Sequence, residues 1–470
     1  MTDVLARLRA LQAADVPVHG GRTLAYVYDS GLAEVDRVAR EAVAAYAGSN
    51  GLDPTAFPSL LEMENDVVGL ACDLLDAPAT TVGTVTSGGT ESVLLAVQAA
   101  RDARPEVANP TMVLPTTAHA AFHKAAHYFG VRPVLVDTGP DFRADAAAMA
   151  SALDSSTVLV VASAPSYAHG VVDPVEPIAA AAGARGIRCH VDACIGGWVL
   201  PYASRLGREV PAWTFAVEGV TSISADLHKY AYAPKGTSVL LHRTPQLRRP
   251  QFFASADWPG YTMLNSTLQS TKSGGPLAGA WATLHAIGDE GYLELARRVL
   301  DGVDRLVAGI EAVPSLRLVA RPDSTLVAFA TDDSCDVFTI ADAMAAEGWW
   351  VQPQLSFRGQ PPTVHLTLSA ATADLVDEFL AALGKAVTTA LDAGPVAVEP
   401  AVADFVRSLD PATLSEEDFD GLLAAVGMAG GAGLPESMAQ INALLDLAAP
   451  ALREALLTAF LDRLARPHRR

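Results

Sequence analysis

Short runs of β-branched residues alternate with alanine-rich helical stretches from about residue 61 onward, and this alternation restricts the possible folds most strongly. Because the runs are almost continuously apolar, both faces of the sheet they form should be covered. The intervening helices are mostly long enough to cross between parallel strands, but a shorter segment joins the last two runs. The pattern predicts an α/β fold with a mostly parallel seven-stranded sheet, one of the last two strands being antiparallel. The predicted strands are Thr81–Val85, Thr111–Leu114, Pro133–Val136, Thr157–Val161, Ile187–Val191, Val220–Ser224 and Ser238–Leu241.

The chain divides into four expected parts. Residues 1–60 predict an N-terminal helical segment, and residues 61–299 predict the large domain that contains the seven-stranded sheet. Residues 300–395 predict a smaller α+β domain, and residues 396–470 predict a helical C-terminal extension. The strands expected in the smaller domain are Leu316–Val319, Thr325–Ala330, Trp349–Gln352 and Thr363–Leu368.

Composition narrows the class of protein. The formal net charge of −20 argues against nucleic acid and against an anionic membrane surface as partners. The four cysteines are scattered, which fits a reducing compartment without a disulfide framework. We find no signal-like start and no apolar run of about 18 residues, so we expect a cytoplasmic protein that does not enter the membrane.

A glycine-rich turn follows the first predicted strand of the large domain. Ser87, Gly88, Gly89 and Thr90 stand between this strand and a helix with an apolar face. Free N–H groups and the positive end of the helix dipole at such a turn bind anions, and a phosphate fits there. An ordinary tight turn with Thr90 as the helix cap explains the segment equally well when it is taken alone.

Candidate catalytic residues stand at the ends of two further predicted strands. In a parallel α/β sheet the carboxyl ends of the strands face the ligand crevice. Asp192 ends one strand and could keep a pyridine nitrogen protonated, although a helix N-cap explains it as well. Lys229 follows the next strand beside His228, a position suited to an imine with an aldehyde. By spacing alone, Lys235 is an equal candidate.

Three histidines, His119, His123 and His127, are spaced so that they could lie on one helical face and bind zinc. No carboxylate or cysteine clusters with them, so we expect no metal site and expect His119 to face a cofactor ring. A phosphate turn, a strand-end aspartate and a strand-end lysine occur in this order on seven alternating strands. This combination predicts a fold-type I enzyme that uses pyridoxal 5'-phosphate.

Several stretches resemble the sphingosine-1-phosphate lyases and the neighbouring group II pyridoxal-phosphate-dependent decarboxylases. The resemblance runs from about residue 45 to residue 390, and its most specific stretch selects Lys229 over Lys235 as the lysine that carries the cofactor. The stretches are Val85–Ser92, Ala118–Phe122, His169–Pro174, Val191–Cys194 and Ser222–Gly236.

The resemblance implies the fold-type I transferase architecture and a role for each matching residue. It implies that the glycine-rich turn cradles the cofactor phosphate, that His119 stacks on the ring, and that Asp192 pairs with the ring nitrogen. His169 would lie close to the cofactor and the substrate, and the enzyme would be a homodimer with active sites at the interface. The cofactor-binding residues expected on this basis are Ser87, Gly88, Gly89, Thr90, His119, Asp192, His228 and Lys229.

Three positions depart from the lyase pattern. Asp53 replaces a histidine, Lys272 replaces an arginine, and Met263 stands in an ungapped comparison where the lyases have a tyrosine, with Tyr261 two positions away. The resemblance implies that these positions read the phosphate of the substrate. A carboxylate at Asp53 would repel a phosphate, and a lysine lacks the two-pronged geometry of arginine. Asp53, Tyr261 and Lys272 are therefore the candidate substrate residues.

These departures order the possible functions. We expect first an amino-acid decarboxylase, in which Lys229 or His169 handles the proton. The alternative is an aldehyde lyase that cleaves the Cα–Cβ bond of a β-hydroxy amine such as sphingosine-1-phosphate. Because we expect a decarboxylase first, we predict weak or absent activity on sphingosine-1-phosphate. A non-catalytic scaffold that binds pyridoxal phosphate is the third possibility, and the complete set of Lys229, Asp192 and His119 argues against it. In each case the partner is a small amino acid or amine.

Overall fold

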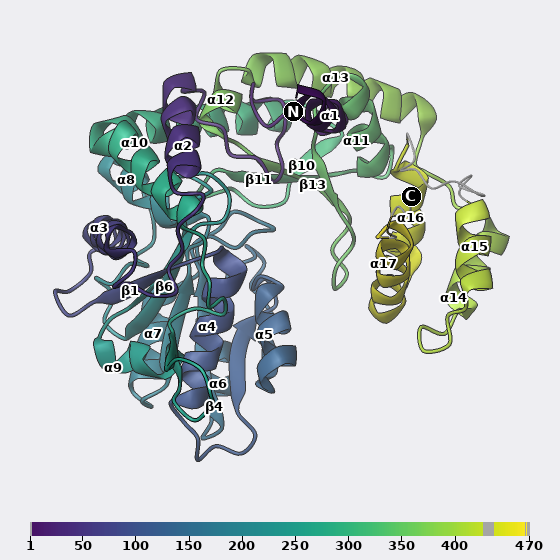
Figure 1. Ribbon diagram of the computed structural model, residues 1–470. Coiled ribbons are helices and arrows are strands. Elements are labelled where there is room, and N and C mark those ends of the chain that lie inside the picture. Colours follow the sequence, from purple (N-terminus) through teal and green to yellow (C-terminus); the bar gives the residue numbers. More distant parts are fainter. Residues whose placement is uncertain (1, 426–436, 466, 468–470) are drawn as a thin grey trace.

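A seven-stranded sheet with the order β1-β7-β6-β5-β4-β2-β3 forms the centre of the computed structural model, which describes residues 2–425, 437–465 and 467 (Figure 1). β7 is antiparallel to both of its neighbours, whereas the strands from β6 to β3 run parallel. Residues 227–237, which join β6 to β7, are too few for a helical crossover, and this explains the reversal. The predicted mostly parallel sheet is thus confirmed. Its strands are β1 Val82–Thr86, β2 Thr111–Pro115, β3 Arg132–Val136, β4 Thr157–Ser163, β5 Arg188–Asp192, β6 Val220–Asp226 and β7 Ser238–His242.

Helices cover both faces of this sheet. They are α3 Pro58–Leu74, α4 Gly89–Asp102, α5 Ala121–Phe129, α6 Ala146–Ala152, α7 Val175–Gly183, α8 Leu200–Arg205 and α9 Pro245–Arg248, with 3-10 turns η1 Gly196–Trp198 and η2 Arg249–Gln251. Met112 and Leu114 of β2 pack with α4 and α5, whereas Val113 between them packs on the opposite side with α6 and α7. Side chains alternate along a strand, so a sheet buried on both faces needs apolar residues at every position.

A second, antiparallel sheet with the order β10-β11-β13-β12 follows the long helix α10 (Gly274–Glu311). The expected division between the two domains, at residues 299/300, falls inside α10. The domain boundaries themselves stay a prediction. The remaining elements of this part are β10 Leu316–Leu318, β11 Leu326–Thr331, α11 Val337–Ala346, β12 Gln352–Gln354, β13 Thr363–Thr367, α12 Ala370–Ala373 and α13 Val376–Ala393, and a small hairpin, β8 Phe253–Ser255 and β9 Met263–Asn265, precedes α10.

One strand of the small sheet lies later than expected. The prediction was Trp349–Gln352, but β12 begins only at Gln352. Trp349 is buried, and its ring meets a phenylalanine of α13 edge-on at 5.2 Å between centroids. Trp350 instead forms an isolated parallel bridge with Thr23 of the N-terminal segment. The two tryptophans that suggested a strand therefore do not pair with β13. Trp349 packs in the core, and Trp350 forms a single bridge.

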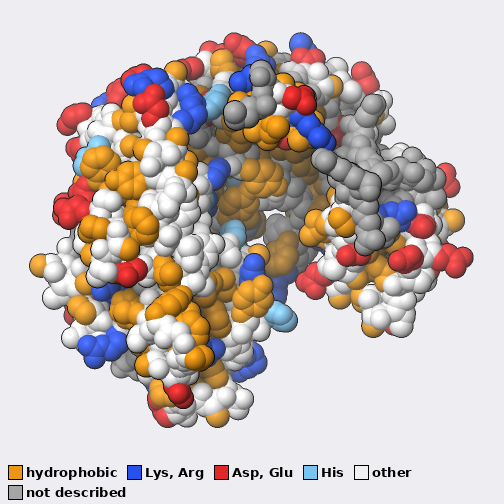
Figure 2. All heavy atoms as spheres, in the orientation of Figure 1, with side chains coloured by type: hydrophobic (Ala, Val, Ile, Leu, Met, Phe, Trp, Pro, Cys, Tyr) orange, Lys and Arg blue, Asp and Glu red, His pale blue; other side chains and the backbone are white. Residues whose placement is uncertain are grey.

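Helices lie at both ends of the chain. The N-terminal segment contains α1 Thr2–Gln12 and α2 Ala33–Ala45, of which α2 packs along α10. The predicted helical extension at the C-terminus is confirmed and consists of α14 Pro400–Ser408, α15 Glu416–Ala425, α16 Ala439–Leu447 and α17 Pro450–Leu464. Its helices share an apolar core of their own, and in the view of Figure 2 a hollow separates them from the part built on the large sheet. Within the described ranges, no helix is long and apolar enough to cross a bilayer.

A carboxylate of the small domain holds the C-terminal helices in place. Asp342 of α11 accepts hydrogen bonds from the backbone N–H groups of Met438 and Ala439 and from the hydroxyl of Ser437, at 2.7–3.1 Å. These donors stand at the start of α16, where a helix leaves its first N–H groups without internal partners. Asp342 therefore acts as an N-cap that comes from another element.

We expect Asp342→Ala to release the C-terminal helices from the small domain. Loss of the acceptor leaves several donors unpaired and should cost about 1–3 kcal/mol at this contact. Hydrogen exchange should accelerate in residues 437–464 and not in the large sheet. Asp462→Ala, which removes an exposed carboxylate of α17, is the matched control; equal exchange in both variants would contradict this role of Asp342.

Candidate active site

A cavity of about 350 Å³ opens where the carboxyl ends of β1, β4, β5 and β6 meet. Its volume lies in the usual range for a small-molecule site. The lining residues come from five segments far apart in sequence, which the parallel arrangement brings to one edge of the sheet. They are Ser87, Gly88, Gly89, Thr90, Glu91, Val93, His119, Ser163, Pro165, Tyr167, Asp192, Cys194, Ile195, Asp226, His228 and Lys229.

The glycine-rich turn forms one wall of the cavity. Gly88 has φ of +154°, a conformation that strains residues with a side chain, and it directly precedes the first residue of α4. A Cβ atom on Gly89 would lie 2.8 Å from both the Asp226 carboxylate and the Cys194 sulfur, so only glycine fits. The carboxylate of Glu91 holds the turn by accepting the N–H of Ser87 at 2.6 Å. The start of α4 thus presents N–H groups to the cavity, as an anion site requires.

Asp192 and His119 line the same cavity. Asp192 is 8% exposed, and its Oδ1 accepts the N–H of Cys194 at 3.1 Å, which fixes the carboxylate at the end of β5. His119 precedes α5, and its Nδ1 accepts the N–H of Ala121 at 3.1 Å. The His119 ring meets that of Tyr167 edge-on at 6.2 Å. His123 and His127, by contrast, are exposed on α5 and do not line the cavity.

Lys229 forms a buried ion pair with Asp226. Its Nζ lies 3.1 Å from Oδ2 of Asp226, and Nε2 of His228 lies 3.5 Å from the same oxygen. Burial by itself would lower the pKa of Lys229, but the nearby acidic groups, of which the Asp226 carboxylate has the largest effect, together outweigh it and raise that pKa above the usual value. Lys229 in turn lowers the pKa of Asp226 against the opposing effect of burial. Both directions describe one charged pair at the end of β6.

Lys235, the competing lysine, lies outside the lining of this cavity. Its Nζ donates to the carbonyl oxygens of Tyr26 at 2.9 Å and His228 at 3.4 Å, and lies 4.8 Å from the ring centre of Tyr28. Burial and the positive charge of Lys229 lower the pKa of Lys235 to about 8. Lys235 therefore places a second positive charge behind the turn that carries Lys229.

The cavity fits the groups of pyridoxal phosphate. It combines an anion-binding helix start, a strand-end carboxylate, an aromatic side chain and one lysine. Two buried oxygens in its lining, Oδ1 of Asp226 and Oγ of Ser163, have no hydrogen-bond partner among the described residues, so a polar group bound there would satisfy them. The residues expected to bind the cofactor therefore come together around one small cavity.

His169 is not among the residues that line this cavity. Its ring stacks on Phe142 at 4.1 Å, and burial lowers its pKa to about 4, so it is neutral at pH 7. Nδ1 of His169 is buried without a partner among the described residues. The role expected for His169, close to the cofactor and the substrate, stays a prediction.

The three candidate substrate residues also lie outside the lining. Asp53 is exposed, and its carboxylate accepts both the N–H and the hydroxyl of Thr55, which lower its pKa. Tyr261 is 54% exposed, its ring meets that of Trp258 edge-on at 5.2 Å, and its carbonyl accepts the Trp258 indole N–H. Lys272 pairs with Glu64 at 3.1 Å and donates to the carbonyl of Val85 at 2.8 Å. Lys272 therefore holds the end of β1 in place.

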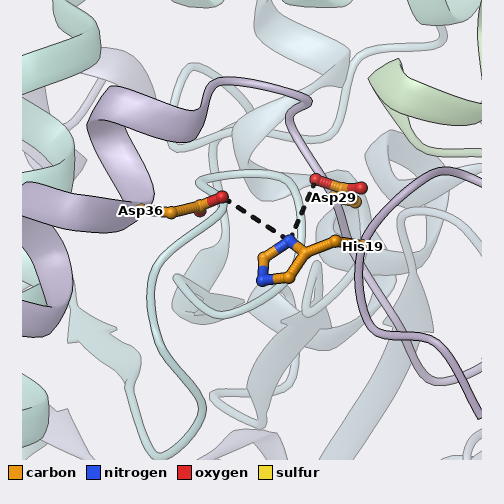
Figure 3. A group of neighbouring side chains, drawn as sticks. All are labelled: His19, Asp29 and Asp36. Atoms are coloured by element: carbon orange, nitrogen blue, oxygen red, sulfur yellow. Dashed lines mark ion pairs between the residues drawn. The ribbon is translucent and has the colours of Figure 1, made fainter.

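A separate group of metal-type ligands occurs in the N-terminal segment. Nδ1 of His19 lies 3.6 Å from Asp29 and 3.5 Å from Asp36 (Figure 3). The two carboxylate oxygens of Asp29 already accept the N–H groups of Gly20 and Gly31. This arrangement joins the N-terminal loop to α2, and none of its residues lines the catalytic cavity.

Comparison with known proteins identifies the family. A family model described as "Pyridoxal-dependent decarboxylase conserved domain" matches residues 25–332, about two thirds of the chain. The chain belongs to the pyridoxal-dependent decarboxylase family. A second model, described as "Pyridoxal-dependent enzyme, C-terminal putative HTH domain", matches residues 400–463, from the first residue of α14 to the last residue but one of α17. The protein is therefore a lyase that uses pyridoxal phosphate, as predicted.

Within this family the chain is similar to sphingosine-1-phosphate lyases. It is 37% identical to the enzyme of Arabidopsis thaliana over 76% of this chain and 66% of that protein, slightly less than two thirds of its length. It is 35% identical to the enzyme of Oryza sativa subsp. japonica over 84% of this chain and 74% of that one. The solved structure of the sphingosine-1-phosphate lyase of Burkholderia pseudomallei matches with a TM-score of 0.78 and 33% identity, over 88% of this chain and 95% of that one. The fold-type I architecture is confirmed by this match.

The sequence analysis assigned no role to several residues that line the catalytic cavity. Asp226 stands three residues before Lys229, and its spacing could have marked it as the partner of the lysine. Tyr167 and Ser163 line the cavity from β4 and the loop that follows it, and no motif indicated them. Only the convergence of strand ends brings these side chains to the site.

We expect Asp226→Asn to change how pH controls covalent loading of the cofactor. Capture of the aldehyde needs the neutral amine, so loading of the wild-type apoenzyme should accelerate about tenfold per pH unit through the alkaline range. Without the Asp226 carboxylate, the effect of burial dominates and lowers the pKa of Lys229. More of the amine is then neutral at pH 7, so covalent loading of the cofactor should be about tenfold faster or more.

Borohydride trapping with peptide mapping measures this loading and should label Lys229 in both proteins. Glu176→Gln, which neutralises an exposed residue of α7, should behave as the wild type. A label on Lys235, or an identical pH profile in Asp226→Asn, would overturn the assignment.

Proposed function

We propose that this lyase cleaves the Cα–Cβ bond of a phosphorylated β-hydroxy amine and releases an aldehyde. The observation that carries the proposal is the similarity to sphingosine-1-phosphate lyases over most of the chain, in sequence and in structure. The substrate should then be a phosphorylated sphingoid-like amine. This is the alternative of the sequence analysis, preferred here to decarboxylation of an amino acid.

The main argument against a phosphorylated substrate was the charge of Asp53, and the surroundings of Asp53 weaken that argument. Its carboxylate is exposed to solvent and engaged by Thr55. Solvent screens a charge in such a place, so its repulsion of a distant phosphate is small. Asp53 therefore gives little reason to exclude a phosphorylated amine.

Lys235 supplies a positive charge suited to a substrate phosphate. Its Nζ lies 3.4 Å from the carbonyl of His228, which lines the cavity one residue before Lys229. The pKa of Lys235 is lowered to about 8. A phosphate bound beside its amine would favour the protonated form of Lys235 and would accept a charge-assisted hydrogen bond from it. Lys235 is thus our candidate for reading the phosphate, in place of Lys272, whose amine is engaged by Glu64.

The roles proposed for the cavity residues follow from their positions. Pyridoxal phosphate, when bound, supplies the electron sink that stabilises negative charge at Cα. We assign phosphate binding to the start of α4, cofactor attachment and proton transfer to Nζ of Lys229, and retention of a proton on the pyridine nitrogen to Asp192. Asp226 orients Lys229 through their ion pair, and the His119 ring covers the cofactor.

Decarboxylation is the second candidate, because the matching family model is that of a decarboxylase domain. Both reactions need the same electron sink and differ in the bond that the site aligns. The released product separates them: a Cα–Cβ lyase gives an aldehyde, and a decarboxylase gives carbon dioxide.

We also propose that the enzyme is a homodimer with a cytoplasmic location. The apolar residues of α1 support a second copy as partner, because the side chains of Val4, Leu5, Leu8 and Leu11 are 57–69% exposed in the single chain. The four scattered cysteines, which fit a reducing compartment, support the cytoplasmic location.

We expect the holoenzyme to convert sphingosine-1-phosphate into a long-chain aldehyde and to release no carbon dioxide from a panel of amino acids. Lys235→Gln should lower kcat/KM for the phosphorylated substrate about 10–100-fold, the value of a charge-assisted hydrogen bond, and should affect unphosphorylated sphingosine far less. Lys124→Gln, which removes an exposed lysine of α5, is the control. Carbon dioxide without aldehyde would favour the second candidate instead.

We expect Asp192→Asn to lower turnover by orders of magnitude while the fold is retained. An amide stabilises a pyridinium charge less well than a carboxylate does, so the electron sink weakens. Steady-state kinetics measures the loss, and circular dichroism with cofactor absorbance checks the fold and the occupancy. Near-normal turnover of a fully loaded Asp192→Asn enzyme would refute this role.

A further inference from the structure

A second cavity, of about 590 Å³, lies apart from the catalytic one and shares no lining residue with it. Its walls come from the end of α3, the segments that precede β1 and β6, α8, and the middle of α10. α10 departs from helical geometry there, at Gly288 (φ 65°, ψ 172°). The cavity therefore lies beside a built-in interruption of the longest helix.

The floor of the cavity is aromatic. Trp198, Tyr202, Trp213 and Tyr292 line it and are each less than 5% exposed. The rings of Tyr202 and Tyr292 stack at 5.9 Å, and the Trp198 ring meets Tyr292 at 6.4 Å. Among the described residues, neither Trp198 nor Trp213 donates its indole N–H to a protein acceptor, although both rings are almost fully buried. The floor thus offers π-faces and hydrogen-bond donors.

The rim of the cavity is acidic. Asp73, Asp76 and Asp289 line it, with Arg205 and His285 as basic groups, and His285 lies 2.7 Å from the carboxylate of Asp66. Arg205 is already neutralised by a two-pronged ion pair with Asp289, at 2.5 and 2.8 Å. Within the described ranges, no lysine or arginine pairs with Asp73 or Asp76, and Asp76 accepts only the hydroxyl of Thr214. The rim therefore carries an excess of negative charge.

The chain itself already places a cation on this floor. The guanidinium carbon of Arg205 lies 5.0 Å from the ring centre of Tyr202. Aromatic faces beside carboxylates are the usual environment for an ammonium group, and an indole N–H without a protein acceptor can donate to a hydroxyl. We propose that this cavity binds a small hydroxylated organic cation of the amino-alcohol class. The proposal does not depend on which bond the catalytic site cleaves.

One hydrogen bond connects this cavity to the cofactor lysine. The hydroxyl of Tyr292 donates to the carbonyl of Ala231 at 2.8 Å, two residues after Lys229. Trp198 also ends the short turn that begins directly after Cys194 and Ile195, which line the catalytic cavity. A cation seated on these rings therefore contacts residues that position the catalytic loop.

Choline is the probe for this site, because a quaternary ammonium cannot react with the aldehyde of the cofactor as a primary amine would. We expect saturable binding of choline to the holoenzyme by isothermal titration calorimetry. Its neutral carbon isostere, 3,3-dimethyl-1-butanol, should bind at least about tenfold more weakly because it lacks the charge. Tetramethylammonium, which lacks the hydroxyl, should also bind more weakly than choline.

Two rim variants test where choline binds. Asp73→Asn and Asp76→Asn should each weaken choline binding about three- to tenfold, and asparagine tolerates the positive φ of Asp76, 52°. Glu62→Gln, which neutralises an exposed residue of the same helix α3 outside the cavity, should leave binding unchanged. No saturable binding, equal binding of the neutral isostere, or unchanged affinity in both rim variants would overturn the proposal.

Discussion

The buried ion pair between Lys229 and Asp226 is the contact on which the active site depends. The side chain of Lys229 is 18% exposed, and burial of this kind would lower its pKa unless a carboxylate offset the cost of removing its charge from water. Asp226 provides that carboxylate from the last residue of β6, and Lys229 follows it by three positions. The pair therefore keeps both groups charged while it holds the lysine amine at the edge of the sheet.

The sheet determines what surrounds this pair. Parallel strands bring their carboxyl ends together, so the glycine-rich turn after β1, Asp192 at the end of β5 and the pair after β6 share one cavity. Close packing then limits the residues allowed: Gly89 touches Asp226 and Cys194 so closely that no side chain fits. The antiparallel strand β7 separates β1 from β6 in the sheet, yet their carboxyl ends still point the same way because each is antiparallel to β7.

The substrate side of the site follows a different principle. Asp53 departs from the lyase pattern in charge and Lys272 departs from it in hydrogen-bond geometry, and these two differences suggested a change of substrate. Their neighbours alter that argument, since Thr55 engages Asp53 in solvent and Glu64 neutralises Lys272. A substituted charge changes specificity only where it faces the substrate without a partner of its own.

The sequence by itself determined the seven strands, the antiparallel strand near the end of the sheet, the small α+β part, the helical extension, the family and the cofactor. The fold elements and the cofactor follow from local signals, namely apolar periodicity, crossover length and motif spacing, and the family follows from the resemblance of several stretches to known enzymes. The tertiary structure alone decided that Asp226 partners Lys229, that Tyr167 and Ser163 join the cavity, and that His169, Asp53 and Tyr261 lie outside its lining. It also moved one strand from Trp349 to Gln352, because burial against α13 and a bridge to Thr23 produce the same local pattern as a strand. Such contacts join residues far apart in sequence, and no local pattern records which of them meet.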